Sequence, residues 1–143
     1  MNIVVDRASD LVNSSLQDEM FTVPNLTAYV LESDWNGLRP VDQLMLMPFK
    51  AGGKICFVPL NAITFTNVAL LKNRFGGFSI AGLVLVSYCQ QFDLPLYTSD
   101  PGMIKVAQQV GVMRYETLGE KLKREMINFE YVVTFKQQKI RNG

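Results

Sequence analysis

Histidine is absent from this chain of 143 residues. Its absence excludes Ser-His-Asp catalysis, Cys-His catalysis and every metal site with histidine ligands. Cysteine is scarce: the only two, Cys56 and Cys89, lie in apolar surroundings and lack CxxC spacing. Such cysteines are more often buried free thiols than partners in a disulfide or a zinc site. The composition therefore excludes the commonest nucleophilic and zinc-based enzyme classes.

Long apolar runs are also missing. The longest, from Ile80 to Val86, is far too short to cross a membrane. The start, MNIVVD, has no basic region and reaches an acid after three apolar residues, so it does not read as a signal peptide. We expect a soluble cytoplasmic protein with no membrane partner. The length suits one domain over residues 1–143, with disorder only at the last few residues.

Charge is spread unevenly, although the formal net charge is only +1. Residues 1–49 carry two basic and seven acidic side chains, whereas residues 101–143 carry eight basic and four acidic ones. An acidic first third could hold a metal ion, and a basic tail could hold a phosphate-bearing partner. Ordinary solvated faces explain the same pattern, so both interpretations stay open.

Short apolar runs alternate with longer helical patterns along the chain. The expected strands are Ile3–Val5, Ile55–Val58, Leu94–Tyr97, Val110–Val112 and Tyr131–Phe135. The first expected helices are Asn25–Trp35, which follows Pro24, and a segment that Pro40 opens and Pro48 ends. The later ones are Asn61 to Gly76, an apolar central helix capped by Ser79, Met103–Val110 and Thr117–Ile127. This alternation predicts an α/β domain with a mostly parallel sheet.

Two acids fall where such sheets bind ligands, at the carboxyl ends of strands. Asp6 ends the first predicted strand, and Asp100 closes the stretch LYTSDP. Asp100 precedes Pro101, so it also suits the N-cap of a helix. Asp6 follows a buried strand and needs hydrogen-bond donors or a cation. Pairing with Arg7 or Arg74 would satisfy it equally well.

The segments NIVVD and LVLVSYCQQFDLPLYTSDPGMIKVAQQVGV together resemble the PIN domain, the metal-dependent ribonuclease fold of many bacterial toxins. That family begins with an apolar strand ending in Asp. It closes its site with a helix, a leucine-proline turn, a strand ending in Thr-x-Asp, a second helix and a short Gly-Val strand. The resemblance covers most of the first 113 residues and is specific from Phe78 to Val112.

The resemblance implies a three-layer sandwich around a mostly parallel sheet. It implies Mg²⁺ or Mn²⁺ held by Asp6 and Asp100, which would also be catalytic, with Thr98 and Ser99 as binding residues. The implied partners are RNA, an antitoxin protein and a second copy in a homodimer. Trp35 and Tyr29 are candidates for the dimer contact, although core packing would explain them equally well.

The sequence departs from the family at two acids. The position of the third acid holds Gly82, and that of the second holds Val30. Glu32 and Asp34 are the nearby candidates to replace the second acid, and Asp34 would share the face of Val30 on the predicted helix. The leading interpretation is therefore a toxin-like ribonuclease with an eroded metal site and weak or lost hydrolysis of RNA. The alternatives are a catalytically inactive PIN-fold module that binds a protein or RNA, and an unrelated α/β domain that binds a small anion.

Overall fold

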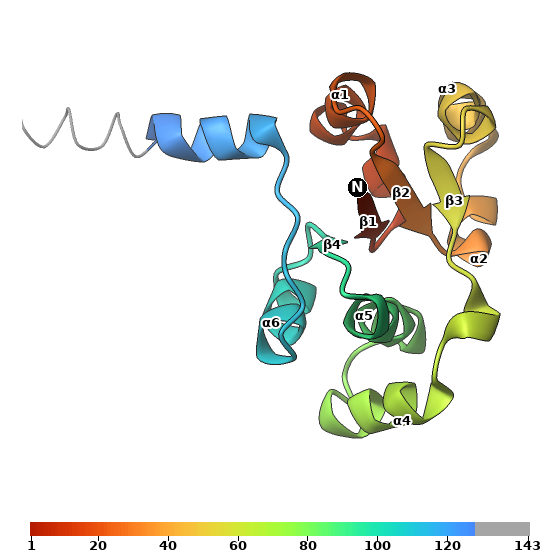
Figure 1. Ribbon diagram of the computed structural model, residues 1–143, viewed down its shortest axis with the longest axis vertical. Helices are drawn as coiled ribbons and strands as arrows, with labels where there is room; N and C mark the ends of the chain where they lie inside the picture. The colour runs from red at the N-terminus through yellow and green to blue at the C-terminus, as the bar shows by residue number, and fades with distance from the viewer. Residues whose placement is uncertain (128–143) are drawn as a thin grey trace, which may run out of the picture.

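Four parallel strands form the centre of the protein. The computed structural model describes residues 1–127, and its sheet has the order β3-β2-β1-β4 (Figure 1). The strands are β1 (Asn2–Val5), β2 (Thr27–Val30), β3 (Ile55–Phe57) and β4 (Leu96–Tyr97). The α/β class and the parallel sheet predicted from the sequence are therefore confirmed.

Strand β1 is buried on both faces, as its run of β-branched residues predicts. Val4 packs into the apolar cluster on one side of the sheet, and Ile3 and Val5 pack into the cluster on the other. All three have no exposed surface. Because β1 lies between β2 and β4, the residue that follows it, Asp6, comes out at the middle of the sheet edge.

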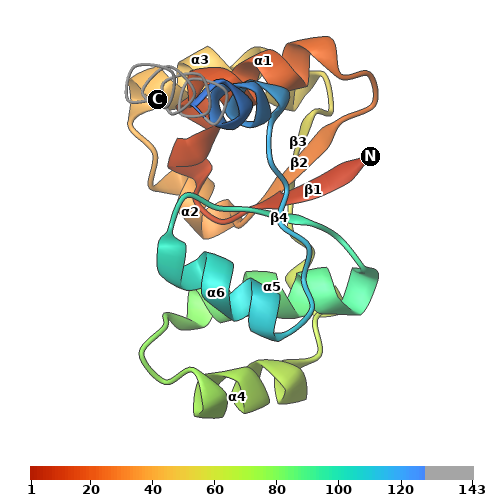
Figure 2. The ribbon, with the colours of Figure 1, turned by 90° about the vertical axis from the view of Figure 1, so that its left-hand side faces the viewer.

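Helices cover both faces of the sheet, as the two views show (Figures 1 and 2). One group comprises η1 (Ala8–Val12), α1 (Ser14–Thr22), α2 (Glu32–Asn36) and α3 (Pro40–Ala51). The other comprises η2 (Leu60–Ala62), α4 (Phe65–Arg74), α5 (Ile80–Phe92) and α6 (Pro101–Gln109). Residues 118–127 add a further helix at the end of the described chain.

Helix α5 is the central helix that the sequence predicts. Every residue from Gly82 to Cys89 is buried, because α4 and α6 cover the sides that the sheet leaves free. Ser79 caps it by accepting a 3.1 Å hydrogen bond from the N–H of Gly82.

The predicted helix over Asn25–Trp35 is wrong. Asn25 has a left-handed backbone with φ of 62°, and the chain turns there into strand β2 before the short helix α2. Strand β2 alternates between half-buried and buried residues, and Ala28 and Val30 face the core. Pairing with β1 on one side and β3 on the other outweighs the helical pattern that the sequence suggests.

Other boundaries differ for local reasons. Helix α1 is absent from the predicted elements, and α3 continues through Pro48 instead of ending before it. The predicted strand Val110–Val112 is a turn around Gly111, whose φ is +78°. A single parallel bridge between Leu96 and Arg114 takes its place beside β4. The predicted strand Tyr131–Phe135 lies outside the described residues.

The helix of residues 118–127 extends away from the body of the protein (Figure 1). Its root is fixed by Glu19 of α1, which accepts hydrogen bonds from the Tyr115 hydroxyl at 2.7 Å and from the N–H of Leu118 at 3.3 Å. Thr117 caps the helix by accepting from the N–H of Glu120 at 3.1 Å. Through residue 127, no helix has the length and apolar character needed to cross a membrane.

Candidate functional site

Three acids from three separate segments line one cavity at the carboxyl ends of the strands. Asp6 follows β1, Asp34 lies on α2 and Asp100 precedes α6. The cavity measures about 630 Å³, and Gly82 of α5 and Arg7 contribute to its wall. The predicted pair of Asp6 and Asp100 is thus brought together, with Asp34 as a third carboxylate.

Asp6 is held by strand β4. Its backbone N–H donates to the carbonyl of Tyr97 at 2.9 Å, and its Oδ2 accepts from Thr98 Oγ1 at 2.8 Å. From the sequence, Arg7 was a candidate partner of Asp6. In the structure Arg7 forms its ion pair with Asp100 instead.

Burial raises the pKa of the Asp6 carboxyl above its ordinary value. The Thr98 hydrogen bond and the charge of Arg7 lower this pKa, whereas the charges of Asp100 and Asp34 raise it further. The Asp6 carboxyl therefore senses the charges of the other two cavity acids. A cation placed beside Asp6 would favour its charged form.

Asp100 is an N-cap, as its position before Pro101 predicts. Its Oδ1 accepts from the N–H of Gly102 at 2.9 Å, and its Oδ2 lies 3.8 Å from an Arg7 nitrogen. Its own N–H donates to Thr98 Oγ1 at 3.1 Å. One carboxylate therefore caps α6 and lines the acid cavity at the same time.

Asp34, rather than Glu32, is the additional acid of the cavity. Its Oδ2 accepts a short hydrogen bond of 2.5 Å from the N–H of Ala8. Glu32 lines a different cavity, beside Phe57 and Pro59. The predicted helix through Val30 is in fact strand β2. Asp34 reaches the cavity because α2 starts directly after β2.

Asp10 is an acid that the sequence argument missed. Its Oδ1 accepts from Ser99 Oγ at 3.4 Å, and its Oδ2 is buried without a hydrogen-bond partner within residues 1–127. Burial raises the pKa of the Asp10 carboxyl, and the nearby charge of Asp6 adds to the rise. In the sequence, Asp10 stands only four residues after Asp6, which is the one local sign that it could reach the same edge of the sheet. In the structure it lies within η1.

The predicted binding residues Thr98 and Ser99 do not line the acid cavity. Thr98 is 3% exposed and donates its hydroxyl hydrogen bond to Asp6, while Ser99 donates to Asp10. Both line a neighbouring cavity of about 380 Å³ that also contains Arg114 and Arg124. Thr98 therefore positions the acids, and its side chain has little surface left for a ligand.

The donor set of the acid cavity is all oxygen, which suits Mg²⁺ or Mn²⁺. Nevertheless, no three acids or cysteines within residues 1–127 stand close enough together to hold a cation as they are arranged. Asp34 and Asp100 are each engaged with a backbone N–H, and Gly82 supplies no oxygen. The residues therefore suit the ion chemically, but the set is geometrically incomplete.

Both cysteines are free thiols, as predicted, but only Cys89 is buried and Cys56 is half-buried. Cys89 is buried in the core cluster, and burial raises the pKa of its thiol to about 12. A thiol with such a pKa stays protonated at neutral pH and is a poor nucleophile. The Cys89 thiol is therefore poorly suited to act as a nucleophile.

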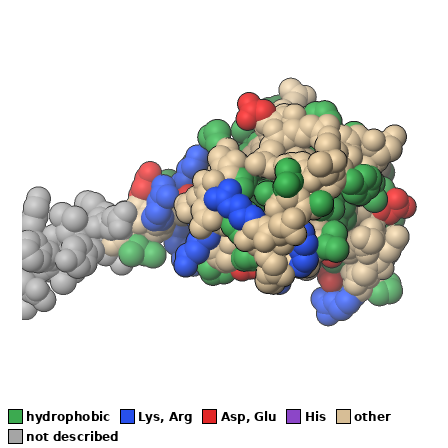
Figure 3. Space-filling model, turned by 90° about the horizontal axis from the view of Figure 1, so that it is seen from below, with side chains coloured by type: hydrophobic (Ala, Val, Ile, Leu, Met, Phe, Trp, Pro, Cys, Tyr) green, Lys and Arg blue, Asp and Glu red, His purple; other side chains and the backbone are tan. Residues whose placement is uncertain are grey.

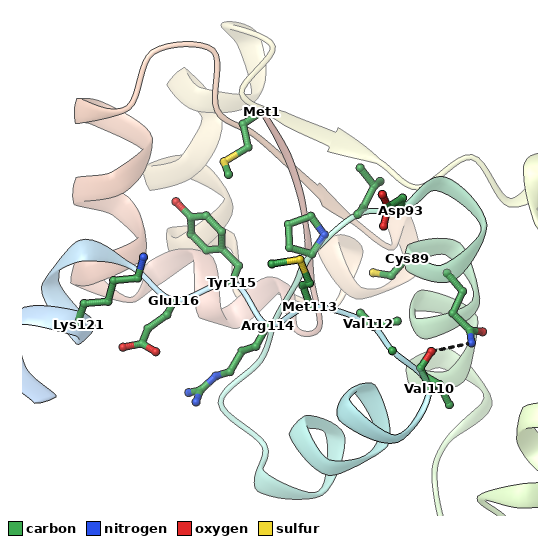
Figure 4. Close-up of a pocket in the computed structure, with 14 residues that line it drawn as sticks. Met1, Cys89, Asp93, Val110, Val112, Met113, Arg114, Tyr115, Glu116 and Lys121 are labelled. Atoms are coloured by element: carbon green, nitrogen blue, oxygen red, sulfur yellow. Dashed lines mark hydrogen bonds between the residues drawn. The ribbon is translucent and has the colours of Figure 1, made fainter.

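A second cavity, of about 650 Å³, lies beyond the amino end of β1 (Figure 4). Met1, Cys89 and the segment 110–116 contribute to its lining, and a hydrogen bond of 3.3 Å from Gln90 Nε2 to the Val110 carbonyl crosses its wall. Ligands of parallel α/β sheets bind at the opposite, carboxyl edge. We therefore take the acid cavity as the candidate site.

Trp35, one of the two predicted dimer contacts, is 4% exposed. Its ring lies 6.3 Å from that of Phe57, with Lys50 Nζ 5.3 Å from its centroid. Tyr29 is half-buried and lies 6.2 Å from Tyr88. Core packing thus accounts for Trp35, and a homodimer remains a prediction that needs another surface.

Neither the protein-family models nor the curated protein sequences contain a match to this chain. The resemblance to PIN domains therefore rests on the residues quoted above.

Proposed function

We propose that the protein is a PIN-like member of the toxin ribonucleases, with a three-layer α/β sandwich and an attenuated metal site. The supporting observation is that Asp6, Asp34 and Asp100 line one cavity at the carboxyl edge of the sheet. Three carboxylates at this edge suit a divalent cation and the phosphodiester of an RNA chain.

In this proposal each acid has a distinct task. Asp6, fixed by Thr98, provides a carboxylate at the centre of the sheet edge. Asp34 and Asp100 each have one oxygen on a backbone N–H, so the second oxygen of each would be the one to hold the cation. A bound Mg²⁺ or Mn²⁺ would supply an activated water for attack on the phosphate.

The attenuation follows from two features of the cavity. Gly82 stands where the family places an acid, so the set lacks one carboxylate. Arg7 carries a positive charge into the wall and pairs with Asp100 at 3.8 Å, which competes with a cation for the same oxygen. Weak cation binding and slow hydrolysis of RNA are the expected result.

Calorimetric titration with Mn²⁺, combined with an assay of RNA cleavage, tests the proposal. Asp6→Asn and Asp34→Asn should abolish both the binding heat and the cleavage, since each removes a charge but keeps the shape of the side chain. Asp18→Asn is the matched control, because Asp18 is an exposed acid on α1 outside the cavity. Equal Mn²⁺ binding in all four proteins would contradict a site at this cavity.

The second candidate function is a catalytically inactive module that binds RNA or a protein such as an antitoxin. It is favoured by the incomplete carboxylate set and by Lys121 and Lys123, which are exposed on the helix of residues 118–127. Figure 3 shows basic side chains along this helix and on the adjoining part of the body. Such a module would bind RNA in EDTA without cleaving it, with an affinity that falls as salt rises.

A further inference from the structure

The acid cavity has an apolar part as well as an acidic one. Its lining within residues 1–127 includes four apolar side chains: Leu31, Phe78, Ala81 and Met103. Phe78 is the one aromatic residue among the described residues that line it. A bare cation gains nothing from apolar surroundings, whereas sites for organic ligands combine apolar and aromatic walls with a few polar groups. The apolar part therefore indicates that the ligand has an organic portion beside the cation.

The Phe78 ring packs against the first turn of α6. Phe78 is half-buried, and its ring meets that of Phe75 edge to face, with 6.4 Å between the centroids. Gly102 leaves room for the ring, since a Cβ there would lie 3.1 Å from Cε1 and 3.2 Å from Cζ of Phe78. Carbon atoms in ordinary contact lie about 3.5–4.0 Å apart. The lack of a side chain at Gly102 thus places the ring directly beside the helix that Asp100 caps.

The backbone of Phe78 is fixed by hydrogen bonds. Lys72 Nζ donates to the Phe78 carbonyl at 2.6 Å and to the Gly76 carbonyl at 3.0 Å. The Phe78 N–H donates to the Phe75 carbonyl at 3.0 Å. A side chain on a backbone that is fixed before the ligand arrives loses less conformational freedom on binding. The ring is therefore suited to act as a preformed contact surface.

Arg7 brings a positive charge to the same cavity. Its side chain is 64% exposed, and its nearest nitrogen lies 3.8 Å from Asp100 Oδ2, which is too long for a hydrogen bond. A guanidinium carries five N–H donors in a planar fork that matches the oxygens of a phosphate. The ion pair with Asp100 leaves these donors available. A cation bound at Asp100 would release Arg7 to such a phosphate.

We propose that Phe78 binds a nucleotide base at the acid cavity and that Arg7 binds the phosphate of the same nucleotide. The inference rests on the proposed function and adds to it the residues that contact the nucleotide beside the cation. Bases of every kind stack on aromatic side chains, because each base has a π face. Phe78 therefore provides affinity for any base, and Arg7 offsets part of the negative charge that the acids place around the phosphate.

Two ligands that differ only in the base test the role of Phe78. Adenosine 5′-monophosphate and ribose 5-phosphate are titrated into the full chain of 143 residues at saturating Mg²⁺, and NMR shifts give the two Kd values. The wild type should bind the nucleotide about tenfold more tightly, a factor within the range of base stacking on an aromatic side chain.

Phe78→Leu should bind both ligands alike, with the wild-type affinity for ribose 5-phosphate. Leucine keeps an apolar side chain against the core cluster that Phe78 touches, so the fold should persist, which circular dichroism verifies. Phe65→Leu is the matched control, since Phe65 is 66% exposed on α4 and does not line the cavity. It should keep the tenfold preference of the wild type.

Arg7→Gln should weaken both ligands by the same factor and keep the preference for the nucleotide, because both ligands carry the phosphate. Equal affinities in the wild type, no binding of either ligand, or a preference that survives Phe78→Leu would overturn the role of Phe78, even if the protein binds Mn²⁺ and cleaves RNA. Unchanged affinities in Arg7→Gln would overturn the phosphate contact. A preference that Phe78→Leu removes, in a protein that does not cleave RNA, would support the base contact and contradict the ribonuclease proposal.

Discussion

Thr98 Oγ1 donates a 2.8 Å hydrogen bond to Asp6 Oδ2, and the two residues are 92 positions apart in the chain. The same hydroxyl oxygen accepts from the N–H of Asp100 at 3.1 Å. A single buried side chain at the end of β4 thus fixes two of the three cavity acids. The acid cavity owes its arrangement to the pairing of β1 with β4.

Replacing Thr98 tests this role directly. Thr98→Val keeps the shape of the side chain but leaves Asp6 without its donor, at a cost of about 1–3 kcal/mol in the free energy of unfolding. It should also raise the pKa of Asp6 further, because this hydrogen bond lowers it. Urea denaturation and an NMR titration of the carboxyl measure the two effects. Thr98→Ser keeps the hydroxyl and should resemble the wild type in both.

The capping role of Asp100 can be separated from a metal-binding role. Asp100→Ala removes the oxygen that accepts from Gly102 and should cost about 0.5–2 kcal/mol, whereas Asp100→Asn keeps it. Thermal denaturation without metal should therefore show only the Ala variant destabilised. If millimolar Mg²⁺ stabilises the wild type but not the Asn variant, Asp100 is a ligand as well as a cap.

Gly82 marks the missing acid, so Gly82→Asp should tighten Mn²⁺ binding in calorimetry. A Cβ at this position would lie 3.3 Å from Met103 Cε, a flexible end that can move aside. Gly76→Asp, in the loop before α5, is the control for added charge. Because glycine weakens a helix, Gly82→Ala should stabilise the fold by about 0.5–1 kcal/mol. A folded Gly82→Asp protein with unchanged Mn²⁺ affinity would show that position 82 does not face the bound Mn²⁺.

The raised pKa values of Asp6 and Asp10 predict an unusual pH dependence. Since both carboxyls bind protons more tightly when folded, the folded state holds more protons, and its stability falls as pH rises through their folded pKa values. Urea midpoints should therefore rise as the pH is lowered through the folded pKa values toward the ordinary value of 3.8. Asp10→Asn should be more stable than the wild type near neutral pH and less sensitive to pH. A wild-type midpoint that falls over this range would contradict the shifts.

Local sequence was enough to predict several features of the fold and one feature of the site. The β-branched run at Ile3–Val5 can be satisfied only by burial on both faces, and helix α5 is apolar nearly all round. Asp100 before Pro101 caps its helix through contacts within two residues. These features depend on neighbours along the chain, so the pattern alone determines them.

Strand β2 and the composition of the acid cavity were decided only by the tertiary structure. The segment Thr27–Val30 is compatible with either a helix or a strand, and parallel pairing with β1 and β3 selects the strand. That choice carries Asp34 to the cavity, and the turn after β1 brings Asp10 to Ser99. Which side chains meet at the carboxyl edge depends on the order of the strands, because residues far apart in sequence are joined there by hydrogen bonds that no local pattern encodes.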